Sequence, residues 1–279
     1  MKKNRLIAPV VKWVGGKRQL IEQITPLLPP KLASYTYCEP FLGGGALLFH
    51  IQPSKAIIND ANEELINVYK VIRDDVDSLI AELKKFSNTS ESFYEVRGWD
   101  KNPETYNALP DVLKAARFLY LNKTCFNGLY RVNNAGEFNT PFGFYKNPNF
   151  INEPTLKAVH AYLKSDAIKL YCGDYVDVLN SLDKKTFVYL DPPYDPVSNT
   201  SNFTGYTKGG FNREEQTRLR EACDELDKKG IKFLLSNSST AFIREQYSNY
   251  TIVPVMAKRA INSVASGRGD IEEVLVKNY

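Results

Sequence analysis

A run of three glycines, Gly43 to Gly45, follows a short apolar segment near the amino terminus and constrains the fold of this chain more than any other feature. The segment at 35–38 predicts a strand, and 46–49 after the glycines predicts the start of a helix. A second strand is expected over 55–58 and ends before Asp60. Strand, glycine turn, helix and strand in this order predict the front of a doubly wound α/β sheet.

The same alternation of strands and helices returns in the second half of the chain. Strands are expected over 168–172, 187–190, 232–235, 251–255 and 271–277, and helices over 63–72, 77–86, 213–229 and 241–247. Residues 261–269 predict a basic loop rich in Ser and Gly. The chain as a whole is therefore expected to be α/β.

Residues 88–165 interrupt this alternation, because they are rich in Asn, Tyr, Phe, Gly and Pro. A helix is expected over 111–122, and 126–150 predicts a hairpin with loops. An inserted small domain explains such a stretch better than one very long loop does.

Composition excludes several classes of protein. Of 279 residues, 43% are hydrophobic and 24% charged, a balance typical of a folded globular chain. No apolar run approaches the roughly 18 residues of a membrane span, and the basic amino terminus lacks the apolar core of a secretory signal. A cytoplasmic protein that does not insert into membranes is expected.

Cysteine and histidine content gives no support for a metal site. The four cysteines, Cys38, Cys125, Cys172 and Cys223, lie far apart without a C-x-x-C pair, which suits a reducing compartment. There are two histidines in the chain. No metal is expected.

Charge is unevenly distributed although the net charge is only +4. Residues 1–20 hold six Lys or Arg and no acidic residue, and 112–150 hold five against one acid. Between them, 60–111 hold twelve acids against six bases. The two basic stretches are compatible with a groove for a polyanion, and equally with scattered solvated charge.

The glycine turn and Asp60 together indicate a nucleoside-like ligand. Glycines after a first strand let the backbone approach such a ligand closely. A carboxylate at the end of the second strand can accept hydrogen bonds from ribose hydroxyls. The alternative is a tight turn that needs glycine for its backbone alone.

The second motif is Asp191-Pro192-Pro193-Tyr194, directly after the expected strand at 187–190. The two prolines fix the backbone and offer carbonyl groups without N–H donors. A carboxylate, a carbonyl and an aromatic ring suit a flat base with an exocyclic amine. The alternative is a Pro-Pro turn with an incidental acid and ring.

Six separated motifs occur in the order found in one enzyme family: 12–17 (Lys-Trp-Val-Gly-Gly-Lys), 39–45, 59–60, 127–131, 137–143 and 191–194. From Lys12 to Tyr279 the chain resembles the S-adenosylmethionine-dependent DNA adenine-N6 methyltransferases of the alpha group, of the Dam and Dpn types. The resemblance implies a Rossmann-like methyltransferase domain at 1–87 and 166–279, with a target-recognition domain inserted at 88–165.

The resemblance also implies which residues hold the cofactor and the amine. The cofactor residues are expected to be Trp13, Lys17, Glu39, Phe41, Gly43, Gly45, Asp60, Asp174 and Asp191, with Asp60 on the ribose and Asp174 on the adenine amine. The catalytic residues are Asp191, Pro192, Pro193 and Tyr194, which accept the target amine and stack on the base.

For DNA, the resemblance implies contacts from Lys12, Phe126, Asn127, Leu129, Arg131, Pro141, Tyr145 and Lys146. Arg131 and Lys12 would read guanines, Leu129 and Pro141 a thymine methyl, Phe126 would intercalate, and Asn127 would organise the opened stack. For Phe126, Leu129 and Pro141 the alternative is a place in a small core. Phe144 stands where the family has a basic residue, so either that phosphate contact is lost or Lys146 replaces it, and Lys146 is assigned to the phosphate.

The predicted activity is methyl transfer from S-adenosylmethionine to adenine N6 in double-stranded DNA, within GATC, by base flipping and direct in-line transfer. A different DNA sequence is the first alternative. An RNA, protein-glutamine or cytosine-N4 methyltransferase, or a non-catalytic DNA-binding module, agrees less well with Asp191. A monomer is expected, and a cognate restriction endonuclease is a conceivable partner.

Overall fold

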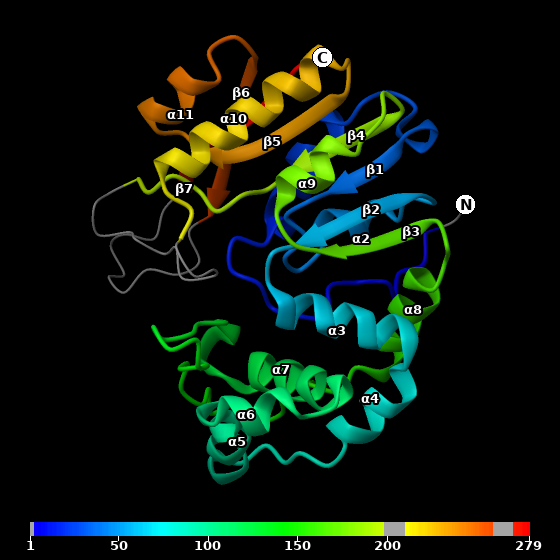
Figure 1. The fold of residues 1–279 in the computed structure, drawn as a ribbon, viewed down its shortest axis with the longest axis vertical. Coiled ribbons are helices and arrows are strands. Elements are labelled where there is room, and N and C mark those ends of the chain that lie inside the picture. Colours follow the sequence, from blue (N-terminus) through cyan, green and yellow to red (C-terminus); the bar gives the residue numbers. More distant parts are fainter. Residues whose placement is uncertain (1–2, 198–209, 259–269) are drawn as a thin grey trace. The chain divides into compact units, whose positions relative to one another are not determined.

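The computed structural model describes residues 3–197, 210–258 and 270–279 (Figure 1). Its strands are β1 (Thr36–Glu39), β2 (Ala56–Asp60), β3 (Ile168–Cys172), β4 (Thr186–Leu190), β5 (Lys232–Ser238), β6 (Thr251–Lys258) and β7 (Asp270–Lys277). Its α-helices are α1 (Ile21–Ile24), α2 (Ala46–Ile51), α3 (Glu63–Asp74), α4 (Val76–Leu83), α5 (Ser90–Arg97), α6 (Pro103–Asn107), α7 (Asp111–Thr124), α8 (Glu153–Leu163), α9 (Tyr175–Asn180), α10 (Arg213–Lys228) and α11 (Ala241–Gln246). Short 3-10 helices are η1 (Lys17–Leu20), η2 (Thr25–Leu27), η3 (Leu32–Ser34), η4 (Gly98–Lys101) and η5 (Phe126–Gly128).

The strands form a mixed seven-stranded sheet in the order β3-β2-β1-β4-β5-β7-β6. β1 pairs in parallel with β2 and β4, and β4 pairs in parallel with β5. β7 runs antiparallel to both β5 and β6. The strand order reverses between β1 and β4, and α/β sheets bind ligands beyond the carboxyl ends of the strands at such a point.

By packing, the chain divides into two compact units. The helical unit comprises Met1–Gly16, Gly43–Gln52 and Asp60–Cys172, and the sheet unit comprises Lys17–Leu42, Pro53–Asn59 and Gly173–Tyr279. The predicted division by function, with an inserted domain at 88–165, stays a prediction.

The core of the sheet unit lies under α9, α10 and α11. Leu219, Cys223 and Leu226 recur along one face of α10 at helical spacing, and all three are buried. They share a hydrophobic cluster with alternate residues of the central strands, such as Phe233 and Leu235 of β5. Alternation along the strands therefore presents one face of the sheet to these helices.

The core of the helical unit is built around α7, which packs against α3, α4 and α5. Arg117 on α7 is only 1% exposed. Its Nη2 lies 2.5 Å from Asp100 Oδ2, and its Nε donates to the Val96 carbonyl at 3.0 Å. Asp100 Oδ2 also accepts from the Phe138 N–H at 2.7 Å. This buried charge is fully partnered, as a charge inside a protein must be, and it joins α7 to the segment that carries Phe138.

The structure confirms the predicted α/β class and most element positions. β5 and β6 each extend three residues beyond the expected strands, because both pair with β7 along that stretch. Over 126–150 the expected hairpin is represented by isolated antiparallel bridges, Cys125↔Phe142 and Val132↔Phe138. The loop expected at 261–269 lies outside the described residues.

Helices α1, α5, α6, α8 and α9 were not predicted. Side-chain oxygens cap the amino termini of α5, α6, α8 and α9; the capping residues are Thr89, Asn102, Asn152 and Asp174. Pro occupies the first turn of α6 and α8. These are ordinary start signals for a helix, but most of these helices are too short to show a clear apolar period. α8 is the exception, because Leu156, Val159 and Leu163 recur along it at helical spacing.

The four cysteines are all free; Cys38, Cys125 and Cys223 are buried, and Cys172 at the end of β3 is exposed. Among the helices that the structure describes, none has both the length and the apolar character needed to cross a bilayer.

Candidate active site and candidate DNA-contacting segments

The Asp-Pro-Pro-Tyr motif begins directly after β4, a strand that is buried along its whole length. The neighbours of β4 are β1 and β5. Asp191 is half-buried and Pro192 is buried. The motif therefore follows the carboxyl end of a central parallel strand, as the sequence predicted, and the structure adds that this point is the reversal of strand order.

Two donors from elsewhere in the sheet unit hold the Asp191 carboxylate. Ser236 Oγ on β5 donates to Asp191 Oδ1 at 2.9 Å. Lys17 Nζ on η1 lies 2.8 Å from the same oxygen, and the Lys17 side chain is 6% exposed. Both donors engage Oδ1, so Oδ2 faces no donor among the described residues and is available to accept from a ligand.

Tyr194 is held at both its hydroxyl and its ring. Its hydroxyl donates to Glu273 Oε2 on β7 at 2.8 Å. Lys17 Nζ lies 4.4 Å from the ring centroid and so covers one face of the ring. Burial, together with the charges of Asp191 and Glu273, raises the pKa of Tyr194 well above its usual value. The phenol therefore stays protonated and remains a donor.

Glu273 belongs to this cluster although the sequence analysis did not select it. Burial raises its pKa above the ordinary value, and the charge of Asp191 adds to the rise. The charge of Lys17 and the hydrogen bond from Tyr194 oppose the rise. The Lys17 ammonium group therefore interacts with the carboxylates of Asp191 and Glu273 and with the ring of Tyr194.

The glycine turn in the helical unit is braced by Asp60. Asp60 Oδ2 accepts from the Gly43 N–H at 2.8 Å, and Oδ1 accepts from the Asn62 N–H at 2.9 Å. Burial raises the pKa of Asp60, while the N–H groups of Asn62, Gly43 and Ala61 oppose the rise. The carboxylate thus already fixes the turn at which the sequence predicts ribose binding.

Trp13 packs against the same turn. Gly43 has φ +49, and a Cβ there would lie 2.6 Å from Trp13 Cδ1. The Trp13 ring stacks on Tyr130 at a centroid distance of 5.7 Å. Glycine at 43 is therefore required both by the backbone conformation and by the indole beside it. Gly45 also has positive φ and precedes α2.

The other predicted cofactor residues of the sheet unit have protein partners of their own. Glu39 is buried and accepts from the Tyr37 hydroxyl at 2.7 Å. The Phe41 ring lies 4.9 Å from that of Tyr175. Asp174 caps α9 through Oδ1, and its Oδ2 lies 2.9 Å from Arg218 Nη2.

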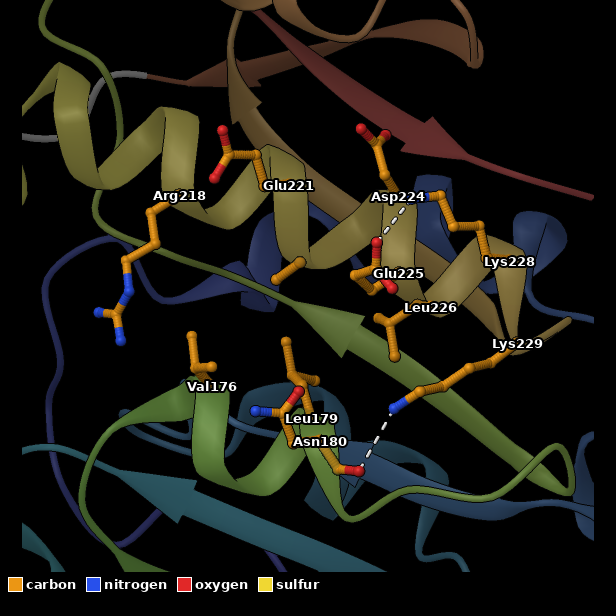
Figure 2. Close-up of a pocket in the computed structure, with 11 residues that line it drawn as sticks. Val176, Leu179, Asn180, Arg218, Glu221, Asp224, Glu225, Leu226, Lys228 and Lys229 are labelled. Carbon is orange, nitrogen blue, oxygen red and sulfur yellow. Dashed lines mark hydrogen bonds and ion pairs between the residues drawn. The ribbon is translucent and has the colours of Figure 1, made fainter.

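A pocket of about 450 Å³ lies between α9 and α10. Figure 2 shows Arg218 on the left side of this pocket and Lys229 on its right side. Lys229 donates to the Asn180 carbonyl and Lys228 to Glu225. Arg218 pairs instead with Asp174 and Glu215, which do not line the pocket. The pocket has none of the predicted catalytic residues in its lining.

In the helical unit, Lys12 is tied to the segment that carries Asn127 to Arg131. Asn122 Oδ1 accepts from the Lys12 N–H at 2.7 Å, and Asn122 Nδ2 donates to the Lys12 carbonyl at 2.8 Å. The same Nδ2 donates to the Gly128 carbonyl at 3.2 Å. Lys12 Nζ lies 4.6 Å from the Tyr145 ring centroid. The buried Asn122 thus places Lys12 beside this segment.

Most predicted DNA-contacting residues are accessible. The exposed ones are Lys12, Phe126, Asn127, Arg131, Pro141 and Lys146, and the half-buried ones are Leu129 and Tyr145. Phe126 and Pro141 are therefore not core residues. Arg131 Nε donates to Asn139 Oδ1 at 2.6 Å. Phe144, where the basic residue is absent, is 77% exposed and has φ +52.

The α/β fold and the motif at the end of β4 agree with the class that the resemblance implies, a methyltransferase that acts on an amino group. Residues 13–261 match the family of D12 class N6 adenine-specific DNA methyltransferases. The chain belongs to this family, and it is an adenine-specific DNA methyltransferase.

Full-length relatives agree with this assignment. The chain is 41% identical to a Type II methyltransferase of Lactococcus lactis subsp. cremoris, over 100% of this chain and 98% of the relative. It is 44% identical to a Type II methyltransferase of Methanocaldococcus jannaschii, over 98% and 99%. It is 35% identical to the DNA adenine methylase of Escherichia coli, over 99% and 95%. The predicted resemblance to Dam-type enzymes is confirmed.

Proposed function

We propose that this enzyme transfers the methyl group of S-adenosylmethionine to N6 of adenine within GATC in double-stranded DNA. The observation that carries the proposal is the cluster around Asp191 and Tyr194 at the end of β4. It combines an acceptor oxygen left free for an amine with an aromatic ring whose position is fixed.

The residues at the glycine turn and at the end of β2 suit this cofactor. Asp60 is a carboxylate acceptor, and the buried Asn59 Oδ1 lacks a hydrogen-bond partner among the described residues. Such acceptors match hydroxyl and N–H groups. We assign cofactor binding to Trp13, Lys17, Glu39, Phe41, Gly43, Gly45, Asp60, Asp174 and Asp191. S-adenosylmethionine supplies an electrophilic methyl group on a sulfonium.

Asp191 and Pro192 then act on the amine. Asp191 Oδ2 and the Pro192 carbonyl each accept one N–H of the target, which directs the nitrogen lone pair away from the ring plane. The Asp191 charge also stabilises the positive charge that develops on nitrogen during transfer. Lys17 and Ser236 keep Oδ1 occupied, so the carboxylate presents Oδ2 in one orientation.

Tyr194 receives the flipped base. Extrusion of the base costs a few kcal/mol, and stacking on an aromatic ring recovers about 1–3 kcal/mol. Because Lys17 covers one face of the ring, the adenine stacks on the opposite face.

We assign sequence recognition to the exposed residues of the helical unit. Arg131 and Lys12 read guanines, Leu129 and Pro141 contact a thymine methyl, and Phe126 and Asn127 act on the opened stack, with Tyr145 beside them. Lys146 contacts a phosphate. We further propose a cytoplasmic monomer, and, since two relatives are named Type II methyltransferases, a partner restriction endonuclease.

Substitution of Asp191 tests the proposed chemistry. Asp191→Ala is expected to abolish methyl transfer to a GATC duplex while DNA affinity stays within about two-fold of wild type, because the carboxylate acts on the amine rather than on the backbone. The matched control is Asp177→Ala, which removes an exposed carboxylate from α9. Wild-type turnover by Asp191→Ala contradicts the assignment of the amine acceptor, and equal rates on GATC and unrelated duplexes contradict the proposed specificity.

A further inference from the structure

Behind the Asp-Pro-Pro-Tyr motif lies a set of polar side chains that the chemistry does not use. Gln216 on α10 is 1% exposed, Asn237 on β5 is 0% exposed, and Asp195, the residue after the motif, is 2% exposed. Polar groups buried to this degree are costly unless each has a partner. Their bonds therefore indicate what they hold in place.

The two amides form a relay between α10 and β5 that ends on the main chain of the motif. Gln216 Nε2 donates to the Pro193 carbonyl at 2.8 Å. Asn237 Nδ2 donates to Gln216 Oε1 at 3.0 Å, and Asn237 Oδ1 accepts from the Asp195 N–H at 3.1 Å. The motif is thus held at one point within it and at one point just beyond it.

Asp195 is fixed from further directions. Ser238 Oγ donates to its carbonyl at 2.7 Å. Thr240 Oγ1 donates to its Oδ2 at 2.7 Å, and Arg213 Nε donates to its Oδ1 at 3.1 Å. Main chain and side chain of this one residue are both anchored, so the carboxyl-terminal end of the motif has a single position.

The prolines explain why such an arrangement is needed. Pro192 and Pro193 have no N–H, so the segment after β4 cannot continue the ladder of the sheet. The Pro193 carbonyl and the Asp195 N–H are main-chain groups that then need side-chain partners. A buried network in which every member is satisfied selects one conformation more strongly than apolar packing does.

We propose that the Gln216–Asn237 amide pair is the positioning device of the active-site motif. It sets the orientation of Asp191 and of the Pro192 carbonyl through the backbone, and neither amide touches the substrate. The inference rests on the proposed function of Asp191 and Pro192 as acceptors of the amine. A displacement of the reacting groups by about 1 Å can lower the rate up to 100-fold. The amide pair therefore controls the methyl-transfer step and not the binding of cofactor or DNA.

The test is Gln216→Met, which keeps the length of the side chain and removes both of its hydrogen bonds. Under single turnover with saturating S-adenosylmethionine and GATC duplex, the methylation rate should fall by roughly 10- to 100-fold. The dissociation constants for cofactor and DNA should stay within about two-fold. Gln216→Asn, which shortens the amide by one methylene, serves if the methionine variant does not fold.

The matched control is Thr186→Val at the opposite end of β4. Thr186 is 2% exposed, and its hydroxyl makes one hydrogen bond, to Asp183. This variant should lose some thermal stability, though less than Gln216→Met because it removes one hydrogen bond rather than two, and its methylation rate should be unchanged. If both variants lose rate in proportion to stability, or if Gln216→Met loses affinity and keeps its rate, the positioning role is overturned.

Asp191→Ala, measured in the same series, separates failure of this inference from failure of the proposed function, because alanine removes the acceptor oxygens. A slow Asp191→Ala beside a wild-type rate for Gln216→Met overturns the positioning role and leaves the acceptor role standing. A wild-type rate for Asp191→Ala overturns the acceptor role itself, and with it the route by which the amide pair would act.

Discussion

The hydrogen bond from Tyr194 to Glu273 joins two residues that are 79 positions apart in the sequence. Glu273 accepts from the hydroxyl and so restrains the ring that is proposed to stack on the target base. Lys17, which lies over a face of the same ring, balances the charges of Glu273 and Asp191. For the methylation rate, the ability of residue 273 to accept this hydrogen bond is therefore expected to matter more than its negative charge.

Two substitutions separate the acceptor from the charge. Glu273→Gln keeps an oxygen that can accept from Tyr194 and should leave the methylation rate within about three-fold of wild type. Glu273→Ala should lower the rate by roughly 3- to 10-fold, the equivalent of losing about 1 kcal/mol from one hydrogen bond. The fluorescence of 2-aminopurine at the target position should change only for Glu273→Ala. Equal losses in both variants would instead assign the effect to the charge.

The raised pKa of Glu273 also predicts a dependence of stability on pH. A carboxyl whose pKa is raised by folding contributes stability that is full below its unfolded value, ordinarily 4.5, and is lost as the pH rises through the folded value. Relative to Glu273→Gln, the wild type should therefore lose melting temperature as the pH rises from 4.5 through the raised pKa. A constant difference across this range would show that folding does not raise the pKa.

Sequence reasoning located Asp191 and Tyr194 because both lie in one short motif after an apolar strand. It missed Glu273 and Asn237, since a contact between distant segments leaves no local pattern. A weak signal did exist at Ser236-Asn237-Ser238, where polar residues continue an otherwise apolar strand. Polar residues in a buried strand indicate partners, but they do not say which ones.

At the scale of elements, the amino-terminal segment of the helical unit packs tightly at Lys12 against the turn at Gly128. Gly128 has φ +65, and a Cβ there would lie 2.2 Å from Lys12 Cδ. Asn122 fixes the main chain of Lys12 on the same side. Any side chain at 128 must therefore displace Lys12.

Gly128→Ala is expected to change how DNA is read as well as how stable the protein is. The left-handed backbone alone costs alanine about 1–2 kcal/mol of stability. The control is Gly136→Ala, which should show only this cost, because Gly136 has φ +87 and no atom lies within 4 Å of its Cβ position. Methylation of GATC relative to its single-base variants should fall for Gly128→Ala alone. An unchanged preference would show that Lys12 does not read a base.

Length alone did not decide which helices were predictable. α10 shows apolar periodicity along its whole length, and α7 is a long helix that is buried almost throughout, whereas α5 and α6 depend mainly on their caps. α8 was missed although apolar residues recur along it at helical spacing. The segment at 126–150 has few regular backbone pairs. In place of the predicted hairpin, two isolated bridges, Cys125↔Phe142 and Val132↔Phe138, connect otherwise irregular backbone.

The net charge of the whole molecule is only +4. Its affinity for DNA is therefore expected to depend on individual cationic side chains that contact the DNA. Exposed Lys146 is proposed to contact a phosphate and exposed Arg131 a base edge. A phosphate contact positions the protein on any sequence, whereas a base contact carries sequence information. The two residues should therefore differ in their salt dependence and in their effect on specificity.

Lys146→Ala should weaken binding to all sequences about equally and reduce the slope of log affinity against log salt by about one. Arg131→Ala should relax discrimination at one base pair by about 1–3 kcal/mol. Lys169→Ala, which removes an exposed lysine from β3, is the control for charge alone. A uniform loss of rate in Arg131→Ala, with site preference unchanged, would contradict the base contact and the GATC assignment that depends on it.

The four cysteines make the native enzyme convenient for labelling. Burial raises the pKa of the Cys125 thiol to about 12, and it also raises the pKa values of Cys38 and Cys223. Thiolates at these three positions are scarce at neutral pH and out of reach of reagents. Cys172, the last residue of β3, is exposed, although partial burial and the charge of Glu63 raise its pKa as well. A maleimide fluorophore should therefore attach at this one accessible thiol without any substitution, which gives the native enzyme a single defined labelling position.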